Sequence, residues 1–283
     1  MKKKAPCVAA VHDLSGLGRC SLSVVLPVLS VMGCACCALP TAYLSASTLY
    51  PASDKFVFQD LTAEMAGASA HWAELDRHFD AVYSGFLGSA DQIAVLEHFL
   101  DVFAAPDTLV LVDPVMGDGG KPYRTCTPEL RERLSALAGR ADLVTPNLTE
   151  AAILLGERYE DVPRDRSGLE RWLRRLSLDG RRSVLLTGVS LKPGTVGCGG
   201  FDRDAGSVFF SAVKEEPAHF PGTGDLFASV TLGALLRGEG LEAGAKLAVE
   251  FVAGCVRRTL ALGTPVREGV QFEALLGELT GGN

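Results

Sequence analysis

No stretch of this 283-residue chain is apolar over the roughly 18 residues that a membrane-spanning helix needs. The basic start, Met-Lys-Lys-Lys, resembles the first region of a signal peptide. However, the apolar run that follows covers only residues 5–11 and ends at His12 and Asp13. We therefore expect neither a secretory leader nor a membrane anchor, and the sequence predicts a cytoplasmic protein.

Positive charge is also scarce. Lys and Arg number 27 against 34 Asp and Glu, which gives a formal net charge of −7. This balance argues against nucleic acid or an anionic membrane as the main partner. We expect small-molecule partners instead.

The eight cysteines lack the pattern of a metal site or a disulfide scaffold. Two paired C-x-x-C motifs, as in many zinc sites, are absent. Cys34, Cys36 and Cys37 crowd into one expected strand, where adjacent side chains point to opposite faces. A chain of this length does not need disulfides to fold, so we expect reduced thiols that pack as small apolar groups.

The chain also lacks an interdomain linker and internal repeats, so a single domain over residues 1–283 is predicted. Short apolar runs alternate with helical patterns, which is typical of an α/β fold with a mostly parallel sheet covered by helices on both faces. The expected strands cover residues 6–11, 34–39, 81–84, 109–112, 143–145 and 184–187. The expected helices cover residues 21–32, 61–77, 90–103, 128–137, 148–155, 169–178, 225–236, 241–260 and 272–279.

One segment breaks this alternation. Residues 195–201 and 208–212 read as strands, and the turn-forming residues 202–206 lie between them. This pattern indicates a β-hairpin, which would add an antiparallel edge to the sheet. The fold class is therefore a three-layer α/β sandwich with a hairpin at one edge.

The most informative motif is Gly222-Thr223-Gly224-Asp225, which opens an apolar run that ends at Leu236. The three residues before Asp225 are expected to form a helix N-terminus, whose free backbone N–H groups bind anions such as phosphate. Asp225 would lie in the first turn, where the helix dipole favours its ionised form and makes it available as a proton acceptor. A plain glycine-rich turn is the alternative that this motif alone leaves open.

Further polar residues follow the expected strands, where ligands bind in open α/β sheets. Asp113 directly follows one strand, and Asp118 comes five residues later in a glycine-rich loop. Asn147 and Glu150 have the spacing of a capping box and share one helix face, from which they could also position metal-bound water and phosphates. Thr187 supplies a hydroxyl at a third strand end. Turn and helix capping are the structural alternatives for the first four residues.

Together these segments resemble the ribokinase-like superfamily, and within it the pyridoxal (vitamin B6) kinases. The resemblance runs from Val11 to about Leu262. It rests on four motifs in order: Asp113-Pro-Val-Met-Gly-Asp118, Thr145-Pro-Asn-Leu-Thr-Glu150, Thr187-Gly188 and Gly222-Thr-Gly-Asp225. It implies a ribokinase-like fold and transfer of the ATP γ-phosphoryl group to the 5′-hydroxymethyl group of pyridoxal, pyridoxine or pyridoxamine in vitamin B6 salvage.

The resemblance also implies roles for individual residues. Asp225 matches the catalytic base, and the amides of Gly222, Thr223 and Gly224 match the anion hole for the transferring phosphoryl group. The remaining matches lie on the ATP and metal side. Asp113, Asp118 and Glu150 match an acidic set around Mg²⁺ and the ATP phosphates, Asn147 matches a capping amide, and Tyr123 matches a residue of the ATP-side loop. Thr145 and Thr187 match two threonines near a monovalent cation such as K⁺.

On the substrate side the match is less complete. Asp13 follows the first strand, where relatives place a polar residue, and Ser45 and Thr48 belong to a Ser-x-x-Thr-x-Tyr segment. Many relatives read Ser-Asn-His-Thr-Gly-Tyr there, so residues 46, 47 and 49 depart from the pattern. Phe86 replaces a tyrosine that often stacks on the pyridine ring; stacking survives this change and a hydroxyl contact is lost.

Two alternatives stay open at the level of sequence. The loop from His12 to Gly18 is also similar to the Ser-Asp-x-Ser-Gly-Gly start of hydroxymethylpyrimidine kinases of thiamin synthesis, although many of those end their anion-hole motif in cysteine where Asp225 stands. The second alternative is a relative that binds the ligand but has no kinase activity. Pyridoxal kinases are mostly homodimers, so the resemblance implies a dimer. Residues 117–125 hold three glycines and would be either a mobile flap or a rigid turn.

Overall fold

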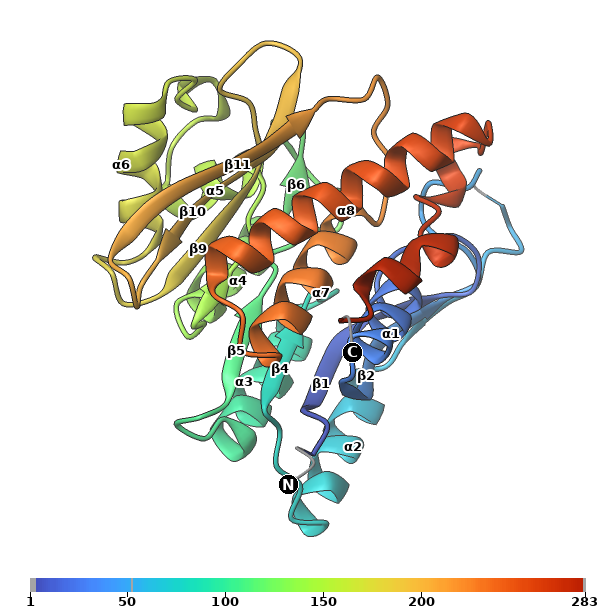
Figure 1. Cartoon of the computed structure of the whole chain (residues 1–283). Helices are drawn as coiled ribbons and strands as arrows, with labels where there is room; N and C mark the ends of the chain where they lie inside the picture. The colour runs from blue at the N-terminus through green and yellow to red at the C-terminus, as the bar shows by residue number, and fades with distance from the viewer. Residues whose placement is uncertain (1–3, 52, 282–283) are drawn as a thin grey trace.

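The computed structural model describes residues 4–51 and 53–281. Its main feature is a nine-stranded sheet in the order β11-β10-β9-β8-β5-β4-β1-β2-β3 (Figure 1). The six strands from β9 to β2 are parallel, whereas β10, β11 and β3 pair antiparallel at the two edges. The bounds are β1 (Cys7–Ser15), β2 (Ala35–Leu44), β3 (Phe58–Asp60), β4 (Ala81–Ser84), β5 (Leu109–Val112), β8 (Leu143–Val144), β9 (Ser183–Val189), β10 (Thr195–Asp202) and β11 (Ser207–Lys214).

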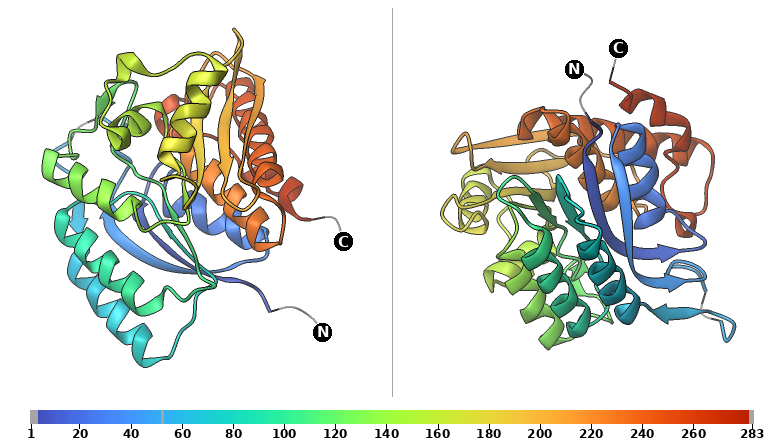
Figure 2. Two further views of the ribbon diagram at one scale, coloured as in Figure 1. Left: turned by 90° about the vertical axis from the view of Figure 1, so that its left-hand side faces the viewer. Right: turned by 90° about the horizontal axis from the view of Figure 1, so that it is seen from below.

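Helices cover both faces of this sheet, which gives the predicted three layers (Figure 2). One face carries α1 (Leu22–Val31), α7 (Thr223–Leu236) and α8 (Leu241–Ala261). The other carries α2 (Thr62–Glu74), α3 (Ala90–Phe103), α4 (Pro128–Ala138), α5 (Leu148–Leu155) and α6 (Arg166–Leu176). Three short 3₁₀ helices complete the chain: η1 (Tyr159–Asp161), η2 (Val266–Glu268) and η3 (Glu273–Leu279).

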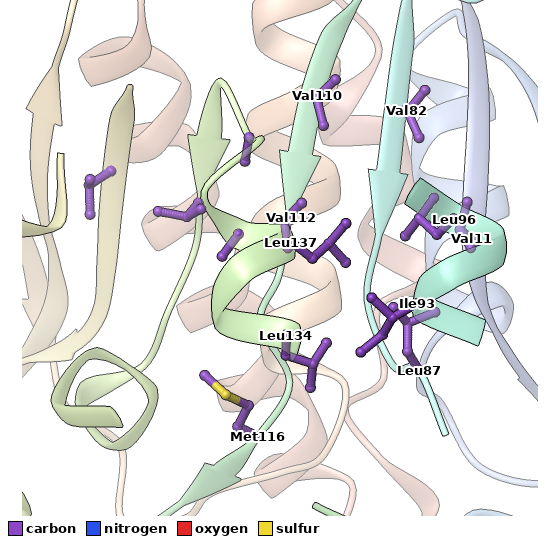
Figure 3. Packing of buried hydrophobic residues seen from close by; sticks show 14 of the residues in the cluster. Val11, Val82, Leu87, Ile93, Leu96, Val110, Val112, Met116, Leu134 and Leu137 are labelled. Carbon is purple, nitrogen blue, oxygen red and sulfur yellow. The ribbon is translucent and has the colours of Figure 1, made fainter. Parts of the chain in front are cut away.

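Strand periodicity divides the core into two parts. Along β1, Ala9 and Val11 pack toward α2 and α3, while Val8 and Ala10 pack toward α1 and α7. Figure 3 shows the first of these cores, where valines of the strands face residues of α3 and α4, among them Ile93, Leu96, Leu134 and Leu137. Both faces of the sheet are thus buried against helices, which explains why the central strands are continuous apolar runs in the sequence.

Local signals fix the helix ends close to the site. The Asn147 side chain accepts hydrogen bonds from the backbone N–H groups of Thr149 and Glu150, and the Glu150 carboxylate accepts one from the Asn147 backbone N–H, so the predicted capping box is present. At the other end of α5, Gly156 adopts a left-handed conformation with φ of 67°. The predicted hairpin is also confirmed, because β10 and β11 pair directly across the turn at 202–206.

Several elements differ from the expectations. β3 and a small antiparallel pair, β6 (Gly117–Asp118) with β7 (Lys121–Pro122), were not predicted, because strands of two or three residues carry too little periodic signal. Two helices begin earlier than expected, α6 at Arg166 and α7 at Thr223, and residues 273–279 form a 3₁₀ rather than an α-helix.

All eight cysteines are free, as expected. Cys7 and Cys37 lie on neighbouring strands with their sulfur atoms 3.7 Å apart. Across residues 4–51 and 53–281, every helix is too short or too polar to cross a bilayer.

Candidate active site

A cavity of about 690 Å³ opens where the parallel strands end and helix α7 begins. Its walls bring together residues that are far apart in the sequence, as expected for the carboxyl edge of an α/β sheet. The predicted site residues that line it are Phe86, Asp113, Asp118, Tyr123, Thr145, Asn147, Glu150, Thr187, Gly222, Thr223, Gly224 and Asp225.

The N-terminus of α7 forms one wall of the cavity. Gly222 is its N-cap residue and has φ of 82°, a conformation that side chains rarely adopt. A Cβ atom at this position would also overlap the carbonyl oxygen of Arg19. Only glycine therefore lets the chain turn here and direct the first backbone N–H groups of α7 into the cavity.

Asp225 lies in the first turn of α7 and faces the same cavity. Its side chain is 17% exposed, and its Oδ2 accepts a hydrogen bond of 2.8 Å from the backbone N–H of Ser21. Burial, with a further contribution from the negative charge of Asp13, raises the pKa of Asp225 to about 6. A carboxylate with this pKa is ionised at neutral pH and is basic enough to accept a proton.

Ser21 is a site residue that the sequence reasoning missed. It has φ of 51° and ψ of −134°, an unfavourable conformation for a residue with a side chain. This conformation directs its backbone N–H to Asp225, while its hydroxyl donates a 2.5 Å hydrogen bond to Asp13. The sequence carries no signal for this role, because a serine before a helix is normally an N-cap and Ser21 makes no capping bond.

Asp113 and Glu150 form a second group of buried acids. Burial and the nearby Asp225 raise the pKa of Asp113 to about 8. Burial and then Asp113 hold the pKa of Glu150 well above its ordinary value, even though its carboxylate accepts hydrogen bonds from Met116 and Asn147. Among the ion pairs of residues 4–51 and 53–281, none involves Asp113 or Glu150. The raised pKa values mean that both acids tend to hold a proton in the free protein, and a cation bound beside them would favour their ionised forms.

Two buried acids with raised pKa values fit a divalent cation that arrives with a nucleotide, because the cation stabilises the ionised carboxylates. Within the described part of the chain, no three His, Cys, Asp or Glu side chains are close enough to hold a metal ion by themselves. Mg²⁺ commonly binds through one or two carboxylates plus substrate phosphates and water, which is the kind of site that Asp113 and Glu150 can provide.

The segment from Gly117 to Pro122 closes one side of the cavity as the β6–β7 hairpin. Gly119 and Gly120 form its turn with positive φ values. Helix α5 holds it at two points, because Asn147 donates to the Gly117 carbonyl at 2.8 Å and the Thr149 hydroxyl accepts from Gly120 N–H at 2.9 Å. These bonds favour a pinned turn over a free flap.

Three predicted substrate residues do not line the cavity. Asp13 is buried behind it and reaches it only through Ser21. The Ser45 hydroxyl accepts a hydrogen bond from Val57 N–H, and Thr48 is exposed. The departures from the family pattern at residues 46, 47 and 49 lie in this same segment.

The far end of the cavity is apolar and was also missed. Its side chains come from β10, β11 and α8, and a run of valines in such elements has no feature that distinguishes a binding slot from a core. They are Val196, Val213, Val249, Val252, Ala253 and Val256. A slot of this kind suits a flat, mostly apolar ring.

The fold is that of ribokinase-like kinases. A family model described as phosphomethylpyrimidine kinase matches residues 26–269. The chain therefore belongs to the phosphomethylpyrimidine kinase family, whose relatives among the matches include pyridoxal kinases.

Two solved structures are similar over nearly their whole length. One, provisionally described as a phosphomethylpyrimidine kinase of Bacteroides thetaiotaomicron and crystallised with pyridoxal, is 40% identical with a TM-score of 0.92. The alignment covers 99% of this chain and 97% of that one. The other, the pyridoxal kinase of Lactobacillus plantarum, is 32% identical with a TM-score of 0.88, over 97% of this chain and 96% of that one.

Several curated relatives match over shorter regions. The pyridoxal kinase of Deinococcus radiodurans is 31% identical over 214 residues, which is 70% of this chain and 67% of that protein. Across the first three curated relatives the matched region covers from 46% to 67% of their length. The matches also include a thiamine biosynthesis bifunctional protein of Geobacter sulfurreducens and a hydroxymethylpyrimidine/phosphomethylpyrimidine kinase of Haemophilus influenzae.

Proposed function

We propose that this kinase transfers the γ-phosphoryl group of ATP to the 5′-hydroxymethyl group of a B6 vitamer: pyridoxal, pyridoxine or pyridoxamine. The observation that carries the proposal is the position of Asp225, which lies at the N-terminus of α7 and lines the same cavity as Asp113 and Glu150. The similar Bacteroides thetaiotaomicron structure with pyridoxal supports the vitamer as the acceptor.

In this proposal Asp225 accepts the proton of the substrate hydroxyl as the oxygen attacks the γ-phosphorus. The backbone N–H groups of Gly222, Thr223 and Gly224 hold the transferring phosphoryl group, because a helix N-terminus stabilises negative charge. Ser21 fixes the Asp225 carboxylate through one oxygen at 2.8 Å. The same Ser21 links Asp225 to Asp13, which makes Asp13 a supporting residue.

Asp113 and Glu150 would hold Mg²⁺ together with the ATP phosphates, and Asp118, Tyr123 and Asn147 line the same part of the cavity. When bound, Mg²⁺ neutralises the charge that develops on the phosphoryl oxygens. The Thr145 hydroxyl is buried and makes no hydrogen bond to the described residues, so it is available to a monovalent cation such as K⁺. Thr187 lies at the end of the neighbouring strand and is the second candidate for that role.

Phe86 is the proposed stacking surface for the pyridine ring, because it is the aromatic residue at the end of β4 that lines the cavity near Ser21 and Asp225. Ser45 and Thr48 would contact the substrate only if the segment that joins β2 to β3 moves toward the cavity.

A hydroxymethylpyrimidine kinase is the second candidate, and the matched family model and the thiamine relatives favour it. The two functions are separated by measuring ADP release with each B6 vitamer and with hydroxymethylpyrimidine under identical MgATP concentrations. We expect a higher kcat/KM for a vitamer. A preference of more than about tenfold for the pyrimidine, or about 1.4 kcal/mol in the barrier, would overturn the assignment.

We further propose that the protein acts as a cytoplasmic homodimer. Five exposed apolar side chains belong to the segment that ends β2 and leads to β3, and we call them the β3 patch: Tyr43, Leu49, Phe56, Val57 and Phe58. Exposed apolar groups that gather in one segment are typical of a protein–protein contact.

A further inference from the structure

His12 is a buried polar residue that no part of the proposed mechanism uses. It lies on β1, is 0% exposed, and both of its ring nitrogens are without a hydrogen-bond partner in the part of the chain that the structure describes. Buried polar groups are nearly always paired, so an unpaired imidazole needs an explanation.

The imidazole lies close to Asp225, the proposed base. His12 Nδ1 is 4.0 Å from Oδ1 of Asp225, while the other carboxylate oxygen, Oδ2, accepts the 2.8 Å bond from Ser21. The two oxygens of Asp225 therefore have different neighbours, one already fixed and one facing His12.

The surroundings hold the ring in this place. The ring of Tyr83 on β4 packs edge-on against it, with centroids 4.3 Å apart. On another side the chain has Gly85, where a Cβ atom would overlap His12 Nδ1. Tyr83 and Gly85 thus border the ring on two sides.

This arrangement costs stability. A buried N–H or ring nitrogen without a partner lowers the stability of the folded protein, and an apolar side chain of similar size would avoid that cost. A costly polar group beside a catalytic carboxylate is expected where function requires it. Burial also lowers the pKa of His12 to about 3, so the ring is neutral at working pH and adds no positive charge that would weaken Asp225 as a base.

We propose that His12 is a positioning residue for Asp225, which donates from Nδ1 to the Asp225 oxygen Oδ1 once ATP and substrate are bound. At 4.0 Å the pair is too long for a hydrogen bond, but catalytic contacts are often long in free enzymes and shorten in the substrate complex. The carboxylate would then be held at both oxygens, by Ser21 and by His12. This inference rests on the proposed role of Asp225.

The proton balance of the reaction is unchanged. The substrate hydroxyl loses its proton to Asp225, the bond from its oxygen to the γ-phosphorus forms, and the bond from that phosphorus to ADP breaks. His12 keeps its Nδ1 proton throughout, and its only role is to orient the Asp225 carboxylate.

Two amide variants test this geometry. His12→Asn places an amide near the position of Nδ1, whereas His12→Gln places it near Nε2, away from Asp225. We expect kcat close to wild type for His12→Asn, and a fall of about 10- to 100-fold for His12→Gln and for the apolar His12→Leu, with KM for ATP little changed. Equal kcat values for the Asn and Gln variants would overturn the proposal.

A double-mutant cycle shows whether His12 acts through Asp225. In an Asp225→Asn background, His12→Leu should cause no further loss of kcat, whereas an equal loss in both backgrounds would refute the coupling. Thr231→Val is the matched control, because Thr231 is another fully buried, unpartnered polar residue on α7, and its kcat should equal that of the wild type. A wild-type enzyme that phosphorylates neither a vitamer nor the pyrimidine would sink the proposed function instead.

Discussion

At Asp225, burial and hydrogen bonding act on one carboxylate in opposite directions. Burial raises its pKa, while the Ser21 N–H bond and the dipole of α7 favour the ionised form. The result is a base that is charged at neutral pH but not strongly stabilised in that state.

Asp225→Asn keeps the shape of this side chain and removes the proton acceptor. We expect kcat to fall by roughly 10²–10⁴-fold, while ATP binding measured by calorimetry is retained. The midpoint of thermal unfolding should not fall, because the variant no longer buries a charge. A folded Asp225→Asn protein with wild-type kcat would show that another group is the base.

The same pKa predicts the pH dependence of the reaction. The raised pKa of about 6 means that Asp225 gains a proton, and ceases to be a base, as the pH falls through this value. We expect kcat/KM for the vitamer to drop about tenfold per unit below that point and to level off above it. The profile should be measured at saturating MgATP, because the proposed metal contact then holds Asp113 ionised and keeps its titration out of the profile. A flat profile from pH 5 to pH 7 would remove Asp225 from this role.

Among the elements, the turn into α7 depends most on a single residue. Gly222→Ala would force a side chain into a φ of 82° and against the Arg19 carbonyl. We expect a loss of about 1–3 kcal/mol in the free energy of unfolding, or roughly 2–4 °C per kcal/mol in Tm. Gly224→Ala is the control, since the nearest atom to a Cβ there, Asp113 Oδ2, is 4.0 Å away. Equal Tm values for the two variants would contradict the argument.

The β6–β7 hairpin is the second element whose behaviour can be tested. Lys121 and Arg124 are exposed, and the hairpin is pinned to α5 by Asn147 and Thr149. Trypsin does not cleave after Lys121, because Pro122 follows it, but it can cleave after Arg124. We expect this cleavage to proceed at similar rates with and without MgATP, as followed by mass spectrometry. Strong protection by nucleotide would show that the hairpin closes over the cavity as a flap.

Elements whose own residues show a clear apolar pattern and clear end signals were predictable from the sequence. The helix at 90–103 and the strands at 81–84 and 109–112 lie where the apolar pattern and the caps placed them. That the glycine turn into α7 and the acids at the strand ends line one cavity was also predictable, because strand ends converge by topology. The contact from Ser21 to Asp225 was not, since it depends on an unusual backbone conformation and joins residues 204 positions apart. β3 exists only through its pairing with β2, so the segment itself carries little information.

On the scale of the whole molecule, the two edges of the sheet differ in how they are paired and covered. One edge ends in the long β10–β11 hairpin, which α8 partly covers (Figure 1). At the other edge, β3 pairs with only Ala42–Leu44, so within the described chain the outer side of residues 35–40 of β2 has no partner strand. An open edge next to exposed apolar side chains is prone to pair with another chain.

The β3 patch therefore gives the dimer proposal a specific test. Sedimentation equilibrium should yield twice the chain mass of 29.9 kDa for the wild type. Phe58→Glu places a charge on a side chain that is 52% exposed, and it should shift the mass toward the monomer, because burying an unpaired carboxylate opposes association. Val102→Glu changes a side chain of similar exposure on α3, far along the chain from the patch, and should leave the mass unchanged. A wild-type protein of 29.9 kDa at working concentration would refute the dimer, and a dimeric Phe58→Glu variant would move its interface away from the β3 patch.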